Sequence, residues 1–102
     1  MPGTVTLSYP EAVECDGIVY VIGQRDGMYR IRRSADRGAT WLPFADNSTE
    51  KPVAAAQSEQ RAALVKLTAQ GRPLLACIPE WPNLAIYISL DDGETWAQES
   101  TV

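Results

Sequence analysis

The sequence of 102 residues contains no histidine. A histidine general base and a metal site with histidine ligands are therefore excluded. Basic residues are also few: nine lysines and arginines stand against thirteen aspartates and glutamates, and the formal net charge is −4. We expect no binding to nucleic acid or to an anionic membrane surface, because both require a basic face. No hydrophobic run approaches the ~18 residues that a membrane-spanning helix needs.

The chain has two cysteines, Cys15 and Cys77. They lie in or beside predicted strands in different halves of the chain, so we expect two free thiols rather than a disulfide. Two cysteines without histidine do not make a zinc site, and we expect neither a metal nor a cofactor. Residues 1–4 show no basic region leading into an apolar stretch, so no signal peptide is expected. The chain should be cytoplasmic as synthesised, or virion-associated if it comes from a phage.

An octapeptide with the pattern S-x-D-x-G-x-T-W occurs twice, at residues 34–41 and 89–96, which we call the first box and the second box. Five fixed positions match by chance on the order of once per million windows. The two copies therefore indicate an internal repeat, and a period near 50 residues is typical of propellers and repeat arrays. The fixed positions are Ser34, Asp36, Gly38, Thr40 and Trp41 in the first box and Ser89, Asp91, Gly93, Thr95 and Trp96 in the second.

The residue types of the box predict a tight turn between two strands. The aspartate can accept hydrogen bonds from backbone N–H groups further along the turn, and the glycine can adopt a positive φ without a Cβ clash. The serine and threonine hydroxyls can satisfy further turn groups, and the tryptophan can bury a large apolar area as the next strand begins. Every fixed position has a structural use, so we expect the box to support the fold and to carry no chemistry.

This octapeptide resembles the Asp-box, or BNR repeat, of sialidases, some other glycoside hydrolases and non-enzymatic β-propellers. In that family the box joins the third and fourth strands of a propeller blade and lies away from any active site. Residues 13–21 and 64–76 also resemble the first hairpin of such a blade. The resemblance implies an all-β chain made of two four-stranded antiparallel blades.

We expect a single domain with a first blade over residues 9–44, an inter-blade linker over residues 45–60 and a second blade over residues 61–102. Residues 4–8 predict an extra strand outside the blades. The alanine-rich stretch from residue 53 leaves open a helix that runs to residue 67. The expected strands cover residues 12–15, 18–22, 28–33 and 40–44 in the first blade and 62–68, 74–78, 84–88 and 96–101 in the second.

Two blades cannot close a propeller, which typically needs four to eight. Two blades alone leave two apolar faces in water, and we therefore expect a homo-oligomer, with a trimer that makes a six-bladed ring favoured. Residues 4–8 can exchange with a neighbouring copy and seal that ring. The alternatives are an excised piece of a larger propeller and two blades that pack as a sandwich. Alternation and box alignment place one set of side chains on the same blade face: Tyr29, Ile31 and Arg33 in the first repeat and Leu84, Ile86 and Ile88 in the second.

Antiparallel strand order gathers the loops opposite the boxes at one end of the blades. The candidate ligand-binding residues at that end are Gln24, Arg25, Asp26, Glu80, Trp81 and Asn83. Trp81 has no counterpart in the first repeat; it either offers a stacking surface for a sugar ring or a partner's apolar anchor, or packs over the blade edge as a plug. Arg25 beside Asp26 is expected to be a solvated turn pair.

These features favour a non-enzymatic binding or structural module, such as a lectin that binds a glycan or a protein of a larger assembly such as a phage virion. The alternative is a sialidase-like glycosidase, for which the resemblance implies three arginines and a tyrosine–glutamate pair. Residues 29–32 only partly match the arginine motif of that family, and Asp26 and Glu80 can meet only across blades. A metal at both boxes is not expected, because Arg37 stands where the second box has Asp92.

Overall fold

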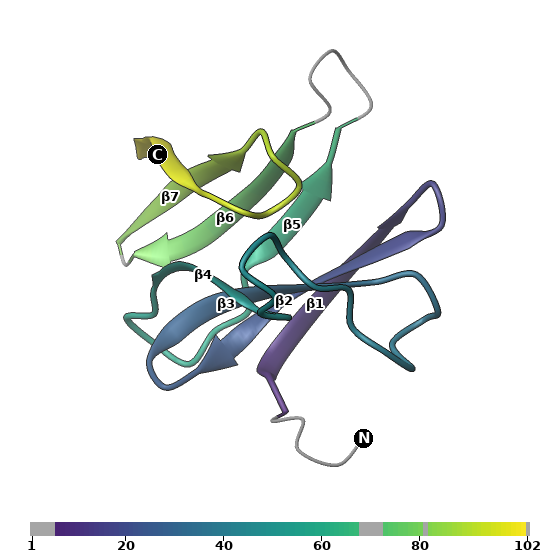
Figure 1. Ribbon diagram of the computed structural model, residues 1–102. Coiled ribbons are helices and arrows are strands. Elements are labelled where there is room, and N and C mark those ends of the chain that lie inside the picture. The colour runs from purple at the N-terminus through teal and green to yellow at the C-terminus, as the bar shows by residue number, and fades with distance from the viewer. Residues whose placement is uncertain (1–5, 68–72, 81, 102) are drawn as a thin grey trace.

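The computed structural model describes residues 6–67, 73–80 and 82–101. They form two four-stranded antiparallel sheets without a helix, as predicted, and each strand pairs with the next one along the chain (Figure 1). Sheet A contains β1 (Ser8–Cys15), β2 (Ile18–Arg25), β3 (Met28–Ser34) and β4 (Lys51–Ala55). Sheet B contains β5 (Ala63–Lys66), β6 (Leu74–Glu80), β7 (Asn83–Ser89) and β8 (Ala97–Thr101). No helix long and apolar enough to cross a membrane occurs in the described ranges.

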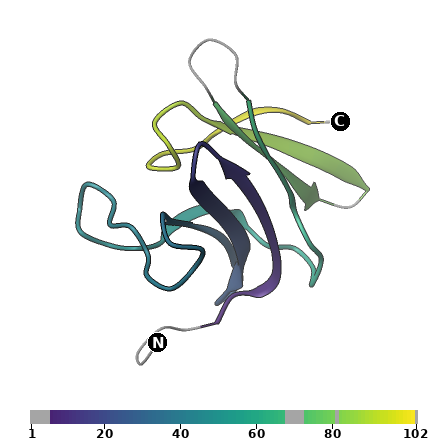
Figure 2. The same cartoon turned by 90° about the vertical axis from the view of Figure 1, so that its right-hand side faces the viewer.

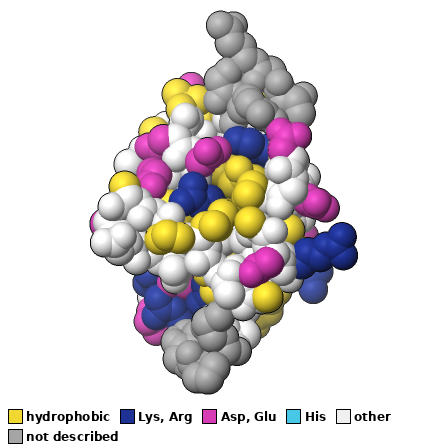
Figure 3. Space-filling model, turned by 45° about the vertical axis from the view of Figure 1, so that its right-hand side comes forward, with side chains coloured by type: hydrophobic (Ala, Val, Ile, Leu, Met, Phe, Trp, Pro, Cys, Tyr) yellow, Lys and Arg dark blue, Asp and Glu magenta, His cyan; other side chains and the backbone are white. Residues whose placement is uncertain are grey.

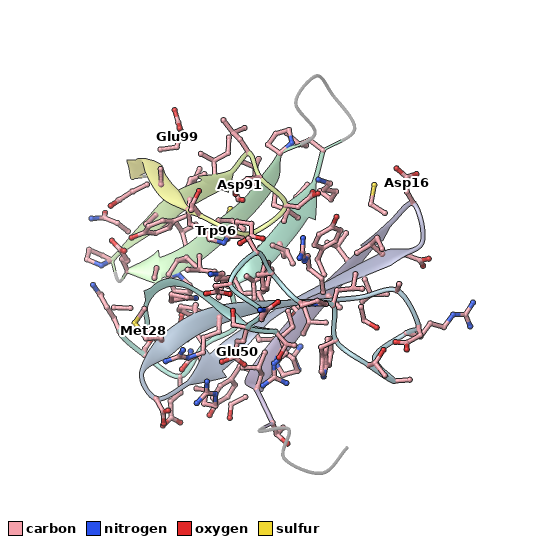
Figure 4. The ribbon with its side chains drawn as sticks, in the orientation of Figure 1. Asp16, Met28, Glu50, Asp91, Trp96 and Glu99 are labelled. Carbon is pink, nitrogen blue, oxygen red and sulfur yellow. The ribbon has the colours of Figure 1, made fainter. Side chains whose placement is uncertain are left out.

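Short turns with positive φ join the first three strands. Asp16 and Gly17 have φ values of 54° and 83°, and Asp26 and Gly27 have values of 55° and 74°. Two successive positive φ angles are the signature of a type I′ turn, whose twist matches that of the flanking strands. Asp16 and Met28 consequently mark opposite ends of sheet A (Figure 4).

The fourth strand of sheet A lies elsewhere than the sequence predicts. Residues 40–44 have no strand structure. Instead β4 falls inside the predicted linker, residues 45–60, and pairs with β3 so that Lys51 lies opposite Ile31. The predicted blade limit at residue 44 is therefore wrong, and sheet A extends to residue 55.

The cause is a loop that the second repeat lacks. In the second repeat β8 begins directly after Trp96, whereas residues 42–50 intervene before β4 in the first. This loop carries Phe44 into the core, where its side chain is 3% exposed. Pro52 lacks an N–H group, and it fits β4 because β4 is an edge strand.

Two further alternatives from the sequence are resolved. The segment from residue 53 to residue 67 is not a helix, since it contains the end of β4 and all of β5. The predicted extra strand at residues 4–8 is not separate, because Ser8 is the first residue of β1; residues 4 and 5 lie outside the described ranges. Leu7 packs so closely on Gly23 that a Cβ there would lie 2.7 Å from the Leu7 Cβ, which explains the glycine. Both cysteines are free thiols, as predicted.

The core lies between the two sheets. We call the side of each sheet that faces the other sheet its inner face, and the opposite side its outer face. The inner face of sheet A contributes Tyr20, Ile22, Tyr29 and Ile31, and the inner face of sheet B contributes Leu74, Ala76, Ile78 and Ala85. All eight side chains are at most 5% exposed.

The sheets diverge from their first strands. The closest approach between them is that of β1 to β5, which do not pair with each other (Figures 1 and 2). Further out, the second box and Phe44 fill the widening gap. A Cβ built on Gly93 would lie 3.6 Å from atoms of both Ile31 and Phe44. The two sheets therefore form a wedge that opens away from β1 and β5.

Sheet A and sheet B contact each other through faces that are not equivalent in the repeat. Aligned on the box serine, Ile31 in sheet A corresponds to Ile86 in sheet B, and Arg30 corresponds to Ala85. Ile31 is fully buried against sheet B, but Ile86 lies on the outer face of sheet B; Ala85 is fully buried, but Arg30 lies on the outer face of sheet A. The stacking is thus face to back, so the same operation can be repeated.

Candidate functional site

Both boxes fold into the predicted turn, and the first box shows its hydrogen bonds. The Ser34 hydroxyl donates to Asp36 Oδ1 (2.7 Å) and accepts from the backbone N–H of Gly38 (2.8 Å). Asp36 accepts from the Thr40 backbone N–H (2.8 Å) and from its hydroxyl (2.5 Å). Arg37 and Gly38 have positive φ values of 59° and 90°. The fixed glycine adopts its value without strain because it has no Cβ.

The second box repeats this geometry. The Ser89 hydroxyl donates to Asp91 (2.8 Å) and accepts from the Gly93 N–H (2.8 Å), while Thr95 donates twice to Asp91 (2.9 and 2.6 Å). The indole N–H of Trp96 also donates to the Gly93 carbonyl (3.0 Å). The fixed polar side chains are therefore used inside each turn, as expected for a structural element.

The tip of the second box also contacts other parts of the chain. Asp92 Oδ1 accepts from the Lys66 ammonium (3.1 Å) and from the Tyr20 hydroxyl (3.5 Å). Glu94 accepts from the backbone N–H of Ala45 (2.8 Å). These contacts tie the second box to sheet A and to the loop before β4, and so they hold the two sheets together.

The box carboxylates are stabilised in their ionised form. The Thr40 hydroxyl, followed by the Thr40 N–H and the Ser34 hydroxyl, lowers the pKa of Asp36 from 3.8 to about 2. Burial acts to raise the pKa of Asp91, but hydrogen bonds from Thr95 and Ser89 outweigh it, and the pKa is lowered. Both aspartates are strong acceptors and poor proton donors, which suits a turn and not a general acid.

We predict that Thr40→Val reduces the acid sensitivity of the fold, because it removes the hydroxyl that lowers the Asp36 pKa most. A folded-state pKa of about 2 lies below the ordinary value of 3.8, so Asp36 stabilises the fold fully above that value and loses this effect as pH falls toward 2. Urea unfolding near pH 5 and pH 2.5 should show a smaller loss of stability in the variant than in the wild type.

Thr49→Val is the matched control, since Thr49 is exposed in the loop before β4 and outside both boxes. It should leave the difference between the two pH values unchanged. An equal acid response of Thr40→Val and the wild type would refute the assigned role of the hydroxyl.

The structure brings three of the predicted ligand-binding residues to one shallow pocket at the end of sheet A opposite the boxes. Gln24 and Arg25, expected in a loop, are the last residues of β2, and Asp26 begins the turn that follows. Next to them, the Tyr9 hydroxyl donates to Glu59 Oε2 (2.8 Å). The pocket has a volume of about 210 Å³ and is lined by Ser8, Tyr9, Gln24, Arg25, Asp26, Gly27 and Glu59.

Gln24 is used to connect the two sheets. Its side chain is buried, and its amide nitrogen donates to the carbonyls of Ser58 (2.8 Å) and Gln60 (2.9 Å). The Tyr29 hydroxyl also donates to the Gln60 carbonyl (2.7 Å). These bonds fix the connection between β4 and β5, so the amide nitrogen of Gln24 serves the fold and only the edge of its side chain borders the pocket.

Arg25 belongs to a charge cluster on the outer face of sheet A, which is centred on Glu50 (labelled in Figure 4). Its guanidinium bonds to Glu50 and also lies 3.0 Å from Asp26, so the predicted turn pair forms. Arg32 binds the other Glu50 oxygen at 2.6 Å. Burial acts to raise the pKa of Glu50, but the two arginines outweigh it and lower the pKa. The cluster stabilises sheet A and leaves Asp26 as its exposed member.

The remaining predicted residues belong to the β6–β7 hairpin of sheet B. Glu80 is the last residue of β6 and accepts from the Tyr87 hydroxyl (3.3 Å). Asn83 is exposed at the start of β7. Trp81 lies outside the described residues. Because Glu80 and Asp26 stand in hairpins of different sheets and have different partners, the structure does not bring them together as a carboxylate pair.

A larger cleft that the sequence analysis missed lies at the opposite end. Lys66 comes from β5, Tyr20 from β2 and Asp92 from the second box, and the Lys66 side chain is only 5% exposed. The cleft holds about 520 Å³ and is lined by Cys15, Asp16, Ile18, Tyr20, Lys66, Leu90 and Asp92. Figure 3 looks toward this end, where hydrophobic side chains gather in the middle and charged ones border them. The sequence signal that could have indicated this cleft is Lys66, a lysine in an otherwise apolar strand.

The polar groups of this cleft bind one another. The Lys66 ammonium lies 5.4 Å from the centre of the Tyr20 ring and bonds to Asp92, as described above. Within residues 6–67, 73–80 and 82–101, no three His, Cys, Asp or Glu side chains stand close enough to hold a metal ion. Comparison with family models, curated proteins and solved structures gave no significant match.

Proposed function

We propose that the chain is a non-enzymatic, self-associating module of the Asp-box β-propeller type, which binds a partner through the loops of its assembled ring. The observation that carries this proposal is the face-to-back stacking of two sheets in a wedge. Such stacking is heterologous, and heterologous contacts make a ring where the rotation from one unit to the next closes. In this proposal sheets A and B are two blades, and three chains supply the six blades of one ring.

The pocket at Tyr9, Asp26 and Glu59 is the proposed ligand site of each copy. Tyr9 is 38% exposed and offers an aromatic surface beside two carboxylates and the Arg25 guanidinium. Carboxylates accept hydrogen bonds from hydroxyl groups, and an aromatic ring packs against the apolar face of a sugar, so the chemistry suits a glycan. Three copies of a shallow site in one ring would raise a weak affinity through multivalency.

The roles of the acidic groups support a non-enzymatic module. The box aspartates are held by serine and threonine, and Glu50 is held by arginines. Glu80 is bonded to Tyr87, in a hairpin of the other sheet from Asp26. A glycosidase needs two carboxyl groups roughly 5–9 Å apart around one bond, and the pair considered from the sequence, Asp26 and Glu80, stands in hairpins of different sheets.

The test is the mass in solution, measured by light scattering behind size-exclusion chromatography. We predict three times the chain mass of 11.2 kDa. A mass of one chain at every concentration would contradict self-association. A trimer would next be screened on a glycan array, with Glu59→Gln as the variant that should lose binding. A trimer that binds no glycan would move the partner to a protein of a larger particle, such as a virion.

A further inference from the structure

The outer face of sheet B is apolar on β5, β6 and β7, and β8 places Ala97 opposite Ile88 and Ser100 opposite Ile86. Its exposed members include Val65 at 44% and Leu84 at 46%, and the others are half-buried or small. One row of paired residues runs through Val65, Leu75, Ile88 and Ala97, and the neighbouring positions are Cys77, Pro79, Leu84 and Ile86. In Figures 1 and 2 sheet B forms one side of the molecule, and no other strand covers it.

The outer face of sheet B is about as large as the buried face of a sheet. Four strands about 4.8 Å apart and about five to six residues long give a sheet face of roughly 400 Å². Its composition is more apolar than that of the face it corresponds to. The inner face of sheet A, which sheet B covers, includes Gln24 and Arg33, whereas the equivalent positions in sheet B are Pro79 and Ile88.

The contact between sheets A and B within the chain shows what covers the inner face of sheet A, which is equivalent in the repeat to the outer face of sheet B. On the inner face of sheet A lie the inner face of sheet B and the tip of the second box, where Gly93 is buried against Ile31. The equivalent glycine of the first box, Gly38, is exposed, as are Arg37 and Ala39 beside it. The first box therefore lacks the neighbouring sheet that the second box has.

The outer face of sheet A offers the matching surface. Its three arginines, Arg25, Arg30 and Arg32, gather around Glu50. Arg32 is 7% exposed beneath the Trp41 ring, 5.5 Å from the ring centre. Beside this cluster the face presents Trp41 with the half-buried side chains Val21 and Met28, and β1 adds the exposed Ala12 and Glu14. Trp41 also corresponds to Trp96, which packs against the core between the sheets.

We infer that the outer face of sheet B binds the outer face of sheet A of a second copy, with the first box of that copy in the place that the second box takes inside the chain. This inference rests on the proposed function and names its interface. A back-to-back pairing of two sheet B faces would leave the first box and the outer face of sheet A without a partner. The head-to-tail contact uses both surfaces of every copy, as the contact inside the chain does.

Two blocked variants test this orientation. Leu84→Glu places a charge on the outer face of sheet B, and Val21→Glu places one on the outer face of sheet A, where Ala12→Glu is the exposed alternative if Val21→Glu does not fold. Leu90→Glu is the matched control, since Leu90 is 71% exposed in the second box and off both sheet faces. Far-ultraviolet circular dichroism checks the fold of each variant before its mass is measured.

Each blocked variant alone should fall from three chains to one, and Leu90→Glu should keep the wild-type mass. An equimolar mixture of Leu84→Glu with the sheet A variant should give the mass of two chains, because one intact junction remains between them. If the mixture stays monomeric, or if the sheet A variants keep the full mass while Leu84→Glu does not, the head-to-tail contact is wrong although the proposed self-association stands. A monomeric wild type would instead overturn the proposed function itself.

Discussion

Ile31→Ala should lower the free energy of unfolding by about 2–5 kcal/mol. Ile31 is fully buried between the two sheets, and the tip of the second box packs on it. Removing its side chain leaves a cavity at the place where the second box, Phe44 and sheet A meet. Because Gly93 of the second box and Phe44 lie against this site, closing the cavity would require one of them to shift. Urea unfolding followed by tryptophan fluorescence measures the effect.

Ile86→Ala is the control that the repeat itself provides, since Ile86 holds the same position in sheet B. It removes the same atoms from the outer face, where the side chain is half-buried. At a protein concentration low enough to keep the chain monomeric, we expect a cost of about 1 kcal/mol or less. Equal costs for the two substitutions under that condition would contradict the assignment of inner and outer faces.

Glu50→Gln should cost about 3–5 kcal/mol of stability at neutral pH, because it leaves the buried Arg32 guanidinium without its counter-charge. The Glu50 side chain is 12% exposed and binds Arg25 and Arg32, with Arg30 at 3.8 Å. Arg32 is the critical partner, since its own side chain is only 8% exposed and cannot turn to water without uncovering Trp41. Thermal unfolding should show the loss as a lower midpoint temperature.

Asp26→Asn removes a carboxylate from the same cluster at its exposed edge, where the side chain is 75% exposed. We expect a change within about 0.5 kcal/mol, as for other surface ion pairs. A large effect of Asp26→Asn together with a small effect of Glu50→Gln would show that the exposed pair, and not the buried one, stabilises sheet A.

The two boxes made most of the fold predictable from the sequence. Each box needs a strand on both sides, and Asp16-Gly17 and the alternation in residues 84–88 located further strands. The strand β4 was missed because box alignment assumes that a strand follows each tryptophan directly. After Trp41 the chain instead forms a loop that places Phe44 in the core, and only then does it pair with β3 as β4. With five residues, β4 is too short for its alternation of buried and exposed residues to reveal a strand in the sequence.

The candidate site was less predictable. Gln24, Arg25 and Asp26 do line one pocket, but Tyr9 and Glu59 reach it from segments about fifty residues apart in sequence. No local pattern encodes such a meeting. The same limit applied to the sheet faces: alternation placed equivalent side chains on equivalent faces, but which face is buried depends on the order of stacking.

The sequence difference between the two boxes determines which box can fill the gap between the sheets. The acidic tip of the second box meets basic residues, with Asp92 at Lys66 and Glu94 near Lys51. The first box carries Arg37 in the place of Asp92, so a first box in the position of the second would set a cation beside Lys66. The two boxes are therefore not interchangeable: the difference between the copies assigns each box to its own sheet.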